Sequence, residues 1–106
     1  MVVEIDVREL SQRIAGANPP VVLDVREPQE LAIARFPGAL EIPMHDVPGR
    51  VAELERTQEI FVLCHHGMRS AHVASFLADQ GFTQVGNVRG GIDAWALLVD
   101  PSVARY

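Results

Sequence analysis

The stretch of sequence that decides the fold is Ile60-Phe61-Val62-Leu63-Cys64-His65-His66-Gly67-Met68-Arg69-Ser70. Its first four residues form an apolar run of the length and composition of a strand that is covered on both faces. A helical pattern then begins near Arg69 and continues to Gln80, with Gly81 as the expected stop. Because a strand, a short loop and a helix in this order form the unit of a parallel sheet, we expect Cys64 at the carboxyl end of a buried strand.

The rest of the chain continues this alternation of short apolar runs and helix-like segments. Strands that alternate with helices predict an α/β fold, with a central, mostly parallel sheet of about five strands flanked by helices. The 106 residues have the length of one domain, so we expect residues 1–106 to form a single domain. The further strands are expected at residues 2–5, 21–25, 39–42 and 85–88, and the further helices after Asp6, over 28–34, from near Asp46 and over 92–99.

The charge of the chain excludes several classes of partner. Nine basic residues, all of them Arg, stand against fourteen acidic ones, which gives a net charge of −5. Binding to nucleic acid or to an anionic membrane surface needs a basic footprint, so we expect neither partner. No stretch approaches the roughly 18 apolar residues that span a membrane, and the first residues lack the pattern of a secretion signal. We therefore expect a cytoplasmic protein, in a compartment where a free thiol stays reduced.

Cys64 is the only cysteine of the chain, so it can form neither an internal disulfide nor a multi-cysteine metal site. A free cysteine at the end of an apolar strand is by default a packing residue. The six residues after it are polar or conformationally particular, which packing alone does not explain. A loop between a strand end and a helix start can direct several backbone N–H groups at one point, and Gly67 gives this loop the necessary freedom. Such a loop, together with Arg69, would stabilise a thiolate, so we favour a nucleophilic Cys64.

The sequence resembles the rhodanese-like sulfurtransferase family in four places. The loop over residues 64–70 is similar to the family's active-site loop, in which a cysteine opens a tight loop that closes with Arg at the sixth position. Residues 23–28, with Glu30, resemble the early signature of the family. Residues 36–39 resemble its middle turn, and residues 88–95 resemble its closing one. The four pieces stand in the family's order across one domain's length, which makes the resemblance specific.

The resemblance implies a single-domain rhodanese fold and a persulfide mechanism. The Cys64 thiolate would attack the outer sulfur of a donor such as thiosulfate, release sulfite, and pass the sulfur to an acceptor such as cyanide, a thiol or a protein. The donor would be a small anion, and no metal or cofactor is expected. The site residues would be Cys64 as the nucleophile, the loop residues His65, His66, Gly67, Met68 and Arg69 as substrate-binding groups, and Asp24, Glu30 and Ser70 as support for the loop.

Three of these side chains have two interpretations each. Arg69 either binds the anionic end of the donor or pairs with Asp24 or Glu30 to hold the loop in shape. Asp24 either orients Arg69 or caps the turn after its strand. Ser70 could donate a hydrogen bond to the thiolate, cap the following helix, or do both.

The identity of the donor depends on the residues around the loop. His65 and His66 either lend positive charge to the mouth of the loop or are solvated without a catalytic role. Some thiosulfate-using members carry a permanent lysine or arginine directly after the cysteine, where this chain has His65. Residues 34–36 read Ala-Arg-Phe where the family commonly has Gly-His-Ile. Thiosulfate is therefore expected to be a poor or surrogate donor.

A phosphatase and a persulfide carrier are the two alternatives to this function. Phosphatases with a cysteine nucleophile have five residues between Cys and Arg, whereas four separate Cys64 from Arg69, and Leu63 replaces the histidine that often precedes the phosphatase cysteine. These differences argue against a phosphatase. The segment 90–95, with the residues that follow it, is similar to rhodanese domains attached to the adenylating enzymes of sulfur-carrier pathways. The alternative function is therefore a persulfide carrier that delivers sulfur to a protein partner, with little turnover on small acceptors.

Overall fold

In the computed structural model, which describes residues 2–106, five parallel strands form one sheet in the order β1-β5-β4-β2-β3. The apolar strand β4 lies in the middle of this sheet, and all four of its residues are buried. The expected α/β fold is therefore confirmed. The strands are β1 (Val3–Ile5), β2 (Val21–Asp24), β3 (Leu40–Glu41), β4 (Ile60–Leu63) and β5 (Val85–Val88).

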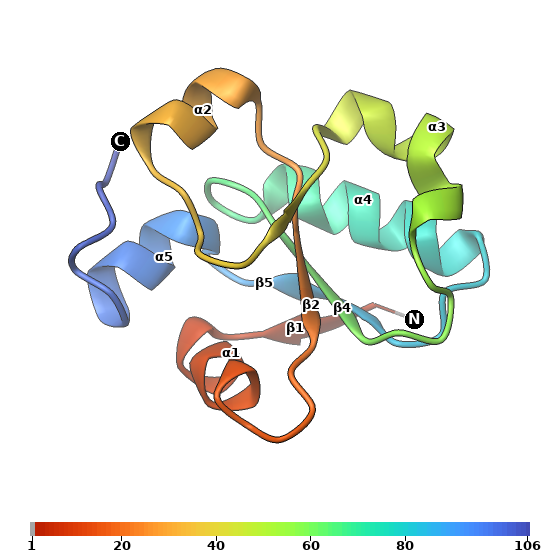
Figure 1. The fold of residues 1–106 in the computed structure, drawn as a ribbon, viewed down its shortest axis with the longest axis horizontal. Coiled ribbons are helices and arrows are strands. Elements are labelled where there is room, and N and C mark those ends of the chain that lie inside the picture. Colours follow the sequence, from red (N-terminus) through yellow and green to blue (C-terminus); the bar gives the residue numbers. More distant parts are fainter. Residues whose placement is uncertain (1) are drawn as a thin grey trace.

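Helices cover both faces of the sheet (Figure 1). α1 and α5 contribute to the core on one face, and α3 and α4 contribute to the core on the other. α2 follows β2 at the carboxyl end of that strand. The helices are α1 (Val7–Ile14), α2 (Pro28–Ile33), α3 (Val47–Arg50), α4 (Met68–Asp79) and α5 (Gly91–Leu98), and two 3-10 turns, η1 (Met44–Asp46) and η2 (Val51–Glu53), flank α3.

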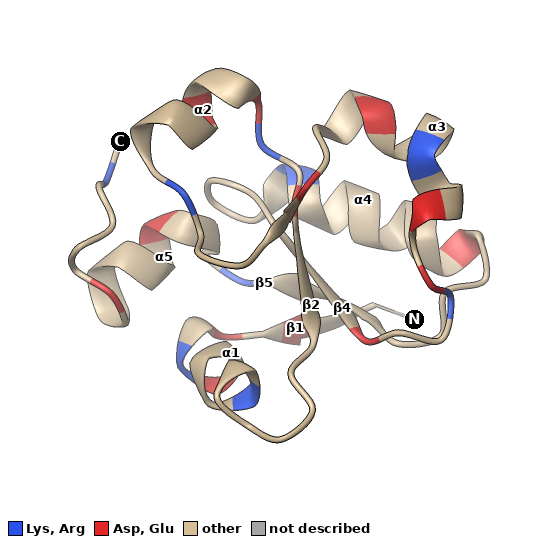
Figure 2. Cartoon of the chain, in the orientation of Figure 1, with Lys and Arg blue, Asp and Glu red and all other residues tan. Residues whose placement is uncertain are grey.

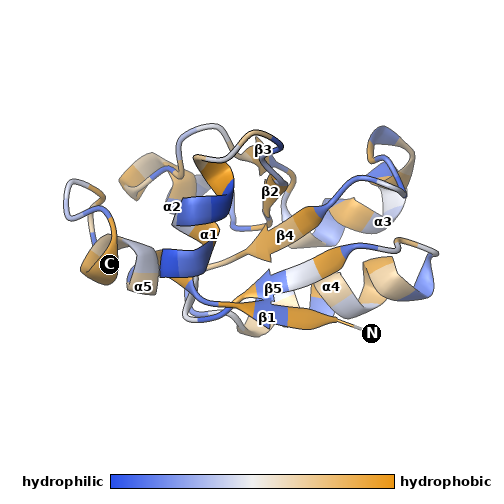
Figure 3. Cartoon of the chain, turned by 90° about the horizontal axis from the view of Figure 1, so that it is seen from below, coloured by the Kyte–Doolittle hydropathy of each residue, from blue (hydrophilic) through white to orange (hydrophobic). Residues whose placement is uncertain are grey.

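The alternation of side chains along β4 determines which face of the sheet Cys64 joins. Phe61 and Leu63 belong to the core on the side of α1 and α5, whereas Ile60, Val62 and Cys64 belong to the core on the side of α4. Successive side chains of a strand point to opposite faces, so this division follows directly from the sequence. Figure 3 shows the strands mainly in the colour of hydrophobic residues, as expected for a sheet that is covered on both faces.

Two expected helices have different outcomes in the structure. α1 begins directly after Asp6, as expected, and the Asp6 side chain caps it by accepting a hydrogen bond of 2.8 Å from the backbone N–H of Glu9. The helix expected from near Asp46 does begin there, as α3 at Val47, but its expected length is wrong, because α3 ends at Arg50 and the flanking residues form η1 and η2. Pro48 lacks an N–H group to donate, and Gly49 costs about 1 kcal/mol relative to Ala in a helix interior, so a continuous helix is disfavoured there.

The carboxyl ends of β2 and β4 lie side by side. Asp24 is paired with Leu63 in the parallel register, and the N–H of Val25 donates to the Leu63 carbonyl at 3.0 Å. Loops that leave parallel strands at this edge of a sheet form the usual site for ligands. The chain therefore brings the segments after β2 and β4 to the same place.

Charged positions of both signs are spread over the helices and loops (Figure 2). Within residues 2–106, no helix has the length and apolar character needed to cross a membrane.

Candidate active site

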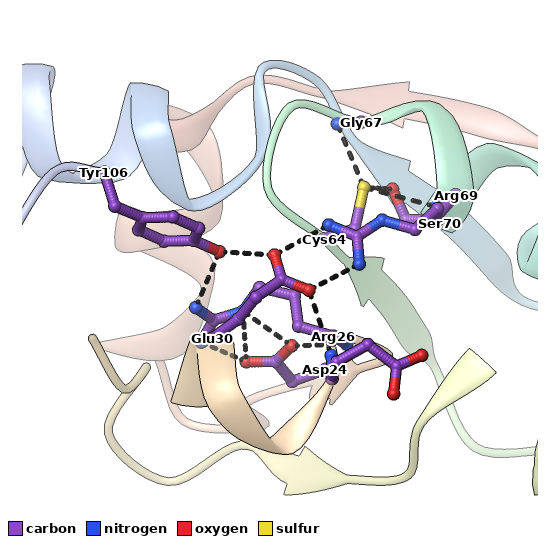
Figure 4. A network of polar contacts seen from close by, with 9 residues as sticks. Asp24, Arg26, Glu30, Cys64, Gly67, Arg69, Ser70 and Tyr106 are labelled. Carbon is purple, nitrogen blue, oxygen red and sulfur yellow. Dashed lines mark hydrogen bonds and ion pairs between the residues drawn. The ribbon is translucent and has the colours of Figure 1, made fainter. Parts of the chain in front are cut away.

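Cys64 lies directly after β4, and only 1% of its surface is exposed. Three groups contact its sulfur. The backbone N–H of Gly67 donates to Sγ at 3.1 Å and the backbone N–H of Ser70 at 3.4 Å, while the Ser70 hydroxyl oxygen lies 3.3 Å from Sγ (Figure 4). Backbone donors directed at one atom favour negative charge on it, so this geometry suits a thiolate.

Gly67 allows the loop to turn back towards the sulfur. Its φ angle is 110°, in the left-handed region that residues with a side chain rarely adopt. It precedes Met68, the first residue of α4, so the helix begins within the loop itself. Ser70 then lies inside the first turn of α4 rather than before it, which makes the helix-capping interpretation of Ser70 wrong.

The loop is supported on one side by the beginning of α5. The backbone N–H of Ile92 donates to the Cys64 carbonyl at 2.9 Å, and that of Asp93 donates to the His65 carbonyl at 3.1 Å. These contacts turn the two carbonyls towards α5 and away from the sulfur. The backbone of Gly91 lies so close to the loop that a Cβ at Gly91 would be 2.5 Å from the Cys64 carbonyl oxygen. The sequence analysis gave Gly91 no role beyond a turn, although two adjacent glycines before a helix are a signal of close backbone approach.

On the opposite side, Arg69 pairs with Glu30 of α2. Its two terminal nitrogens donate to the two carboxylate oxygens at 2.6 and 2.8 Å, which is a bidentate ion pair. Of the two partners that the sequence offered for Arg69, the structure selects Glu30. The hydrogen bonds from Arg69 are the main reason that the pKa of Glu30 falls to about 2, and hydrogen bonding to Glu30 raises the pKa of Arg69 above its ordinary value.

Asp24 does not contact Arg69 as one interpretation expected. Its carboxylate accepts hydrogen bonds from the Arg26 side chain at 2.7 and 2.9 Å, and both side chains are fully buried. An unpaired buried charge is costly, so the Asp24 carboxylate needs a cation beside it. Arg26, two residues further along the chain, provides that cation. Asp24 is connected to the loop only indirectly, because Arg26 bonds to Tyr106 and Tyr106 stacks on His65.

Tyr106 joins these two ion pairs, and the sequence analysis did not assign it a role. Its hydroxyl donates to Glu30 Oε2 at 2.7 Å and accepts from Arg26 at 3.1 Å (Figure 4). Its ring stacks on the His65 ring, with centroids 3.8 Å apart and an angle of 9° between the planes. Burial is the main cause that raises the pKa of Tyr106 to about 12. A contact between residues 76 positions apart carries no local pattern that the sequence could reveal.

The two loop histidines differ in their surroundings. His65 is stacked between His66 and Tyr106, and its Nε2 has no hydrogen-bond partner within residues 2–106. His66 is exposed, and so is Met68, at 77% of its surface. Neither imidazole donates to the Cys64 sulfur in the described part of the chain. A hollow of about 290 Å³ is lined by Cys64, His65, His66, Met68 and Arg69.

Asn87 of β5 is a further polar residue of this site that the sequence analysis missed. It is 3% exposed, and its amide bonds to both Gly67 and Ser70, the two residues whose N–H groups contact the sulfur. An Asn in the middle of a short apolar run was the available signal, because a buried amide must find partners.

These residues together have the geometry of a site for a nucleophilic thiol. A buried thiol receives two backbone N–H donors, opens onto a small hollow, and is surrounded by a loop that is fixed on two sides. The arrangement can stabilise an anionic sulfur and present it to a small group that enters the hollow.

Comparisons with known proteins agree with this geometry. A model of the family described as "Rhodanese-like domain" matches residues 6–98. A "Sulfurtransferase" of Allochromatium vinosum is 41% identical over 104 residues, which cover 98% of this chain and 97% of that protein. A "Putative sulfur carrier protein YrkF" of Bacillus subtilis is 37% identical over 92 residues, which cover 87% of this chain and 50% of that protein.

Solved structures give the same result. The crystal structure of a rhodanese-like domain protein from Staphylococcus aureus superposes with a TM-score of 0.86 at 28% identity, over 99% of both chains. A rhodanese-related protein from Thermoplasma volcanium superposes with a TM-score of 0.85 at 33% identity, over 98% of this chain and 99% of that one. The chain therefore belongs to the rhodanese-like domain family.

Proposed function

We propose that the protein is a sulfurtransferase that works through a persulfide on Cys64. The Cys64 thiolate attacks the outer, sulfane sulfur of a donor such as thiosulfate. A new S–S bond forms, the old one breaks, and its electron pair leaves with sulfite. An acceptor such as cyanide, a thiol or a protein then attacks the outer sulfur of the persulfide, and the electron pair of that S–S bond returns to Cys64.

The observation that carries this proposal is the pair of backbone N–H groups directed at the sulfur. Gly67 and Ser70 place their N–H groups 3.1 and 3.4 Å from Sγ. Fixed donors of this kind stabilise negative charge without reorganisation during the reaction, which benefits the attacking thiolate. The single thiol needs a reducing compartment to stay free, and the cytoplasm provides one.

A second candidate function is that of a persulfide carrier for a protein partner. Both terminal nitrogens of Arg69 are engaged by Glu30, so this guanidinium is not free to bind a dianionic donor without losing an ion pair. A relative of this chain is named as a putative sulfur carrier protein. These observations support slow turnover with thiosulfate and transfer to a protein acceptor.

The test combines a steady-state assay with mass spectrometry of the intact chain. With thiosulfate and cyanide, we expect thiocyanate and an adduct on Cys64 with the mass of one sulfur atom. Cys64→Ser is the matched control and should give neither. If the natural chain gives no thiocyanate above this control and accepts no sulfur from any donor, the proposal is wrong. An adduct that forms but reacts slowly with cyanide and quickly with a protein thiol identifies the carrier.

A further inference from the structure

Asn87 lies in the middle of β5 and makes hydrogen bonds in three directions. Its Nδ2 donates to the Gly67 carbonyl at 3.1 Å and to Glu4 Oε2 at 2.8 Å. Its Oδ1 accepts a hydrogen bond from the Ser70 hydroxyl. One buried amide therefore connects β1 with both residues that contact the Cys64 sulfur.

These contacts fix the orientation of the amide. Both protons of Nδ2 are directed at oxygen acceptors, one from Gly67 and one from Glu4. A reversed amide would place its oxygen against these two oxygens and leave all three without a proton between them. The carbonyl oxygen of Asn87 must therefore face Ser70. Since that oxygen has no proton to give, Ser70 is the donor in the bond between them.

The orientation of Asn87 decides what Ser70 offers to Cys64. A serine hydroxyl has one proton and two lone pairs. With its proton held by Asn87, Ser70 presents lone pairs to Sγ, which lies 3.3 Å away. This contact is favourable when Cys64 is a thiol that donates its S–H, and unfavourable when the sulfur is an anion. To stabilise the thiolate, Ser70 would have to leave the Asn87 oxygen buried without a donor, which is costly.

We propose that Asn87 is a positioning residue for Cys64. It holds the Ser70 proton, so the hydroxyl does not stabilise the free thiolate. Cys64 is therefore favoured in its persulfide form over the free thiolate. This inference rests on the proposed function. In the persulfide, Sγ is bonded to a second sulfur and the negative charge lies on that outer atom. When an acceptor takes the outer sulfur, the electron pair of the S–S bond returns to Sγ and forms the anion that Ser70 opposes. Discharge is slowed as a result, which suits a carrier.

Other charged groups around Cys64 form a common background in every variant compared below. They come from α4, α2, the loop, α5 and β1, and are Arg69, Glu30, His65, His66, Asp93 and Glu4. Asn87→Leu also removes the hydrogen bonds to Glu4 and to the Gly67 carbonyl. The double variant with Ser70→Ala lacks the same two bonds, so the difference between Asn87→Leu and the double variant reports on the hydroxyl.

The test is the pH profile of Cys64 alkylation by iodoacetamide, measured on the full chain. Asn87→Leu releases the Ser70 proton to the thiolate, and we expect the midpoint of the profile to fall by about one pH unit. Ser70→Ala removes the lone pairs that oppose the thiolate and should lower the midpoint slightly. The double variant should have the same midpoint as Ser70→Ala alone. A midpoint that rises in Ser70→Ala would show that Ser70 already donates to the thiolate, and would overturn the proposal.

Further variants keep the test decisive. If Asn87→Leu does not fold, Asn87→Ala removes the same acceptor with a smaller side chain and should give the same fall. A fall that persists when Ser70 is replaced by Ala would also overturn the proposal, because it would not pass through the hydroxyl.

Sulfur transfer provides an independent second measurement. The persulfide of Asn87→Leu should pass its sulfur to a small thiol several-fold faster than that of the natural chain, and an unchanged rate overturns the proposal. Alkylation requires no sulfur transfer, so the two proposals fail separately. A chain that takes up no sulfur but shows the expected profiles disproves the sulfurtransferase function alone. A chain that transfers sulfur with unshifted profiles disproves the positioning role of Asn87 alone.

Discussion

The loop over residues 64–70 is fixed on two sides by different means. On the α5 side, the backbone N–H groups of Ile92 and Asp93 bind the first two carbonyls of the loop, and Gly91 makes room for the contact. On the α2 side, a single charged side chain, Arg69, reaches across to a carboxylate. The first contact is backbone against backbone and the second is an ion pair at the mouth of the site.

The two kinds of contact respond differently to the pH and salt concentration of the solution. Backbone contacts between uncharged groups do not titrate and are not screened by salt, but they tolerate no added volume. The ion pair between Glu30 and Arg69 is partly exposed, at 15% and 32% of the two side chains, so pH and salt act on it. We infer that the α5 side sets the geometry around the sulfur, and that the α2 side sets how firmly the loop is held.

The largest effect is expected from breaking the α5 side with Gly91→Ala. The new methyl group would lie 2.5 Å from the Cys64 carbonyl oxygen, and the φ angle of 60° is unfavourable for Ala. We expect a loss of about 3 kcal/mol in the free energy of unfolding, measured by urea denaturation. The rate of Cys64 alkylation should also change, because the loop must move.

Gly38→Ala is the matched control for this prediction. Gly38 has a φ angle of 81°, and no atom lies within 4 Å of the position of its Cβ, so only the backbone cost remains. That cost should be about 1 kcal/mol. Equal losses in the two variants would mean that the close approach at Gly91 contributes nothing.

A smaller effect is expected from breaking the α2 side with Glu30→Gln. At neutral pH, we expect a loss of about 1 kcal/mol in the free energy of unfolding, because the ion pair is partly exposed. The folded pKa of Glu30, about 2, is below its ordinary value of 4.5. The natural chain should therefore keep this stabilisation above about pH 4.5 and lose it as the pH falls towards 2, whereas Glu30→Gln should lack this part of the pH dependence. Urea denaturation between pH 3 and about pH 7 measures the difference.

Glu53→Gln is the control for the ion pair. Glu53 pairs with Arg50 on the surface, three residues away in the sequence. Because both groups are exposed, we expect no measurable loss of stability in this variant. A Glu30→Gln chain that matched Glu53→Gln at every pH would show that the α2 side does not hold the loop.

The smallest effect is expected from Tyr106→Phe, which keeps the ring and removes only the hydroxyl. The hydroxyl donates to Glu30 at 2.7 Å, so its loss should raise the pKa of that carboxyl while the stacking on His65 is retained. We expect a loss of less than about 1 kcal/mol in the free energy of unfolding at neutral pH. The pH at which Glu30 titrates, followed by NMR of the side-chain carboxyl, should move upward. An unmoved titration would contradict a role of Tyr106 in the ion pair.

The fold was predictable from local patterns in the sequence. The apolar run over residues 60–63 indicated a buried strand, and the helix-like segment after Asp6 indicated where α1 begins. The position of Cys64 followed from these patterns, because the carboxyl end of a parallel strand is a defined place. The helix from near Asp46 begins as predicted but is shorter than its apolar spacing indicated, and it contains Pro48 and Gly49, which disfavour its continuation.

The contacts that fix the site could be predicted only in part. The sequence offered Asp24 and Glu30 equally as partners of Arg69, because both follow β2, and only the side-chain geometry separates them. Asn87 and Tyr106 bond to residues of segments that are far apart from them in the chain, so no spacing pattern in the sequence reveals these contacts. Whether Cys64 carries sulfur stays a prediction until it is measured.

The support of the loop by α5 has a consequence for the order of folding. Cys64 lies near the middle of the described chain, but the N–H groups that hold the carbonyls of Cys64 and His65 belong to residues 92 and 93. The first strand, β1, pairs only with β5, the last one in the sequence. Contacts of such long sequence separation form late and slowly. A chain emerging from the ribosome therefore completes the contacts around Cys64 only after residues 92 and 93 have been synthesised and can pack against the loop.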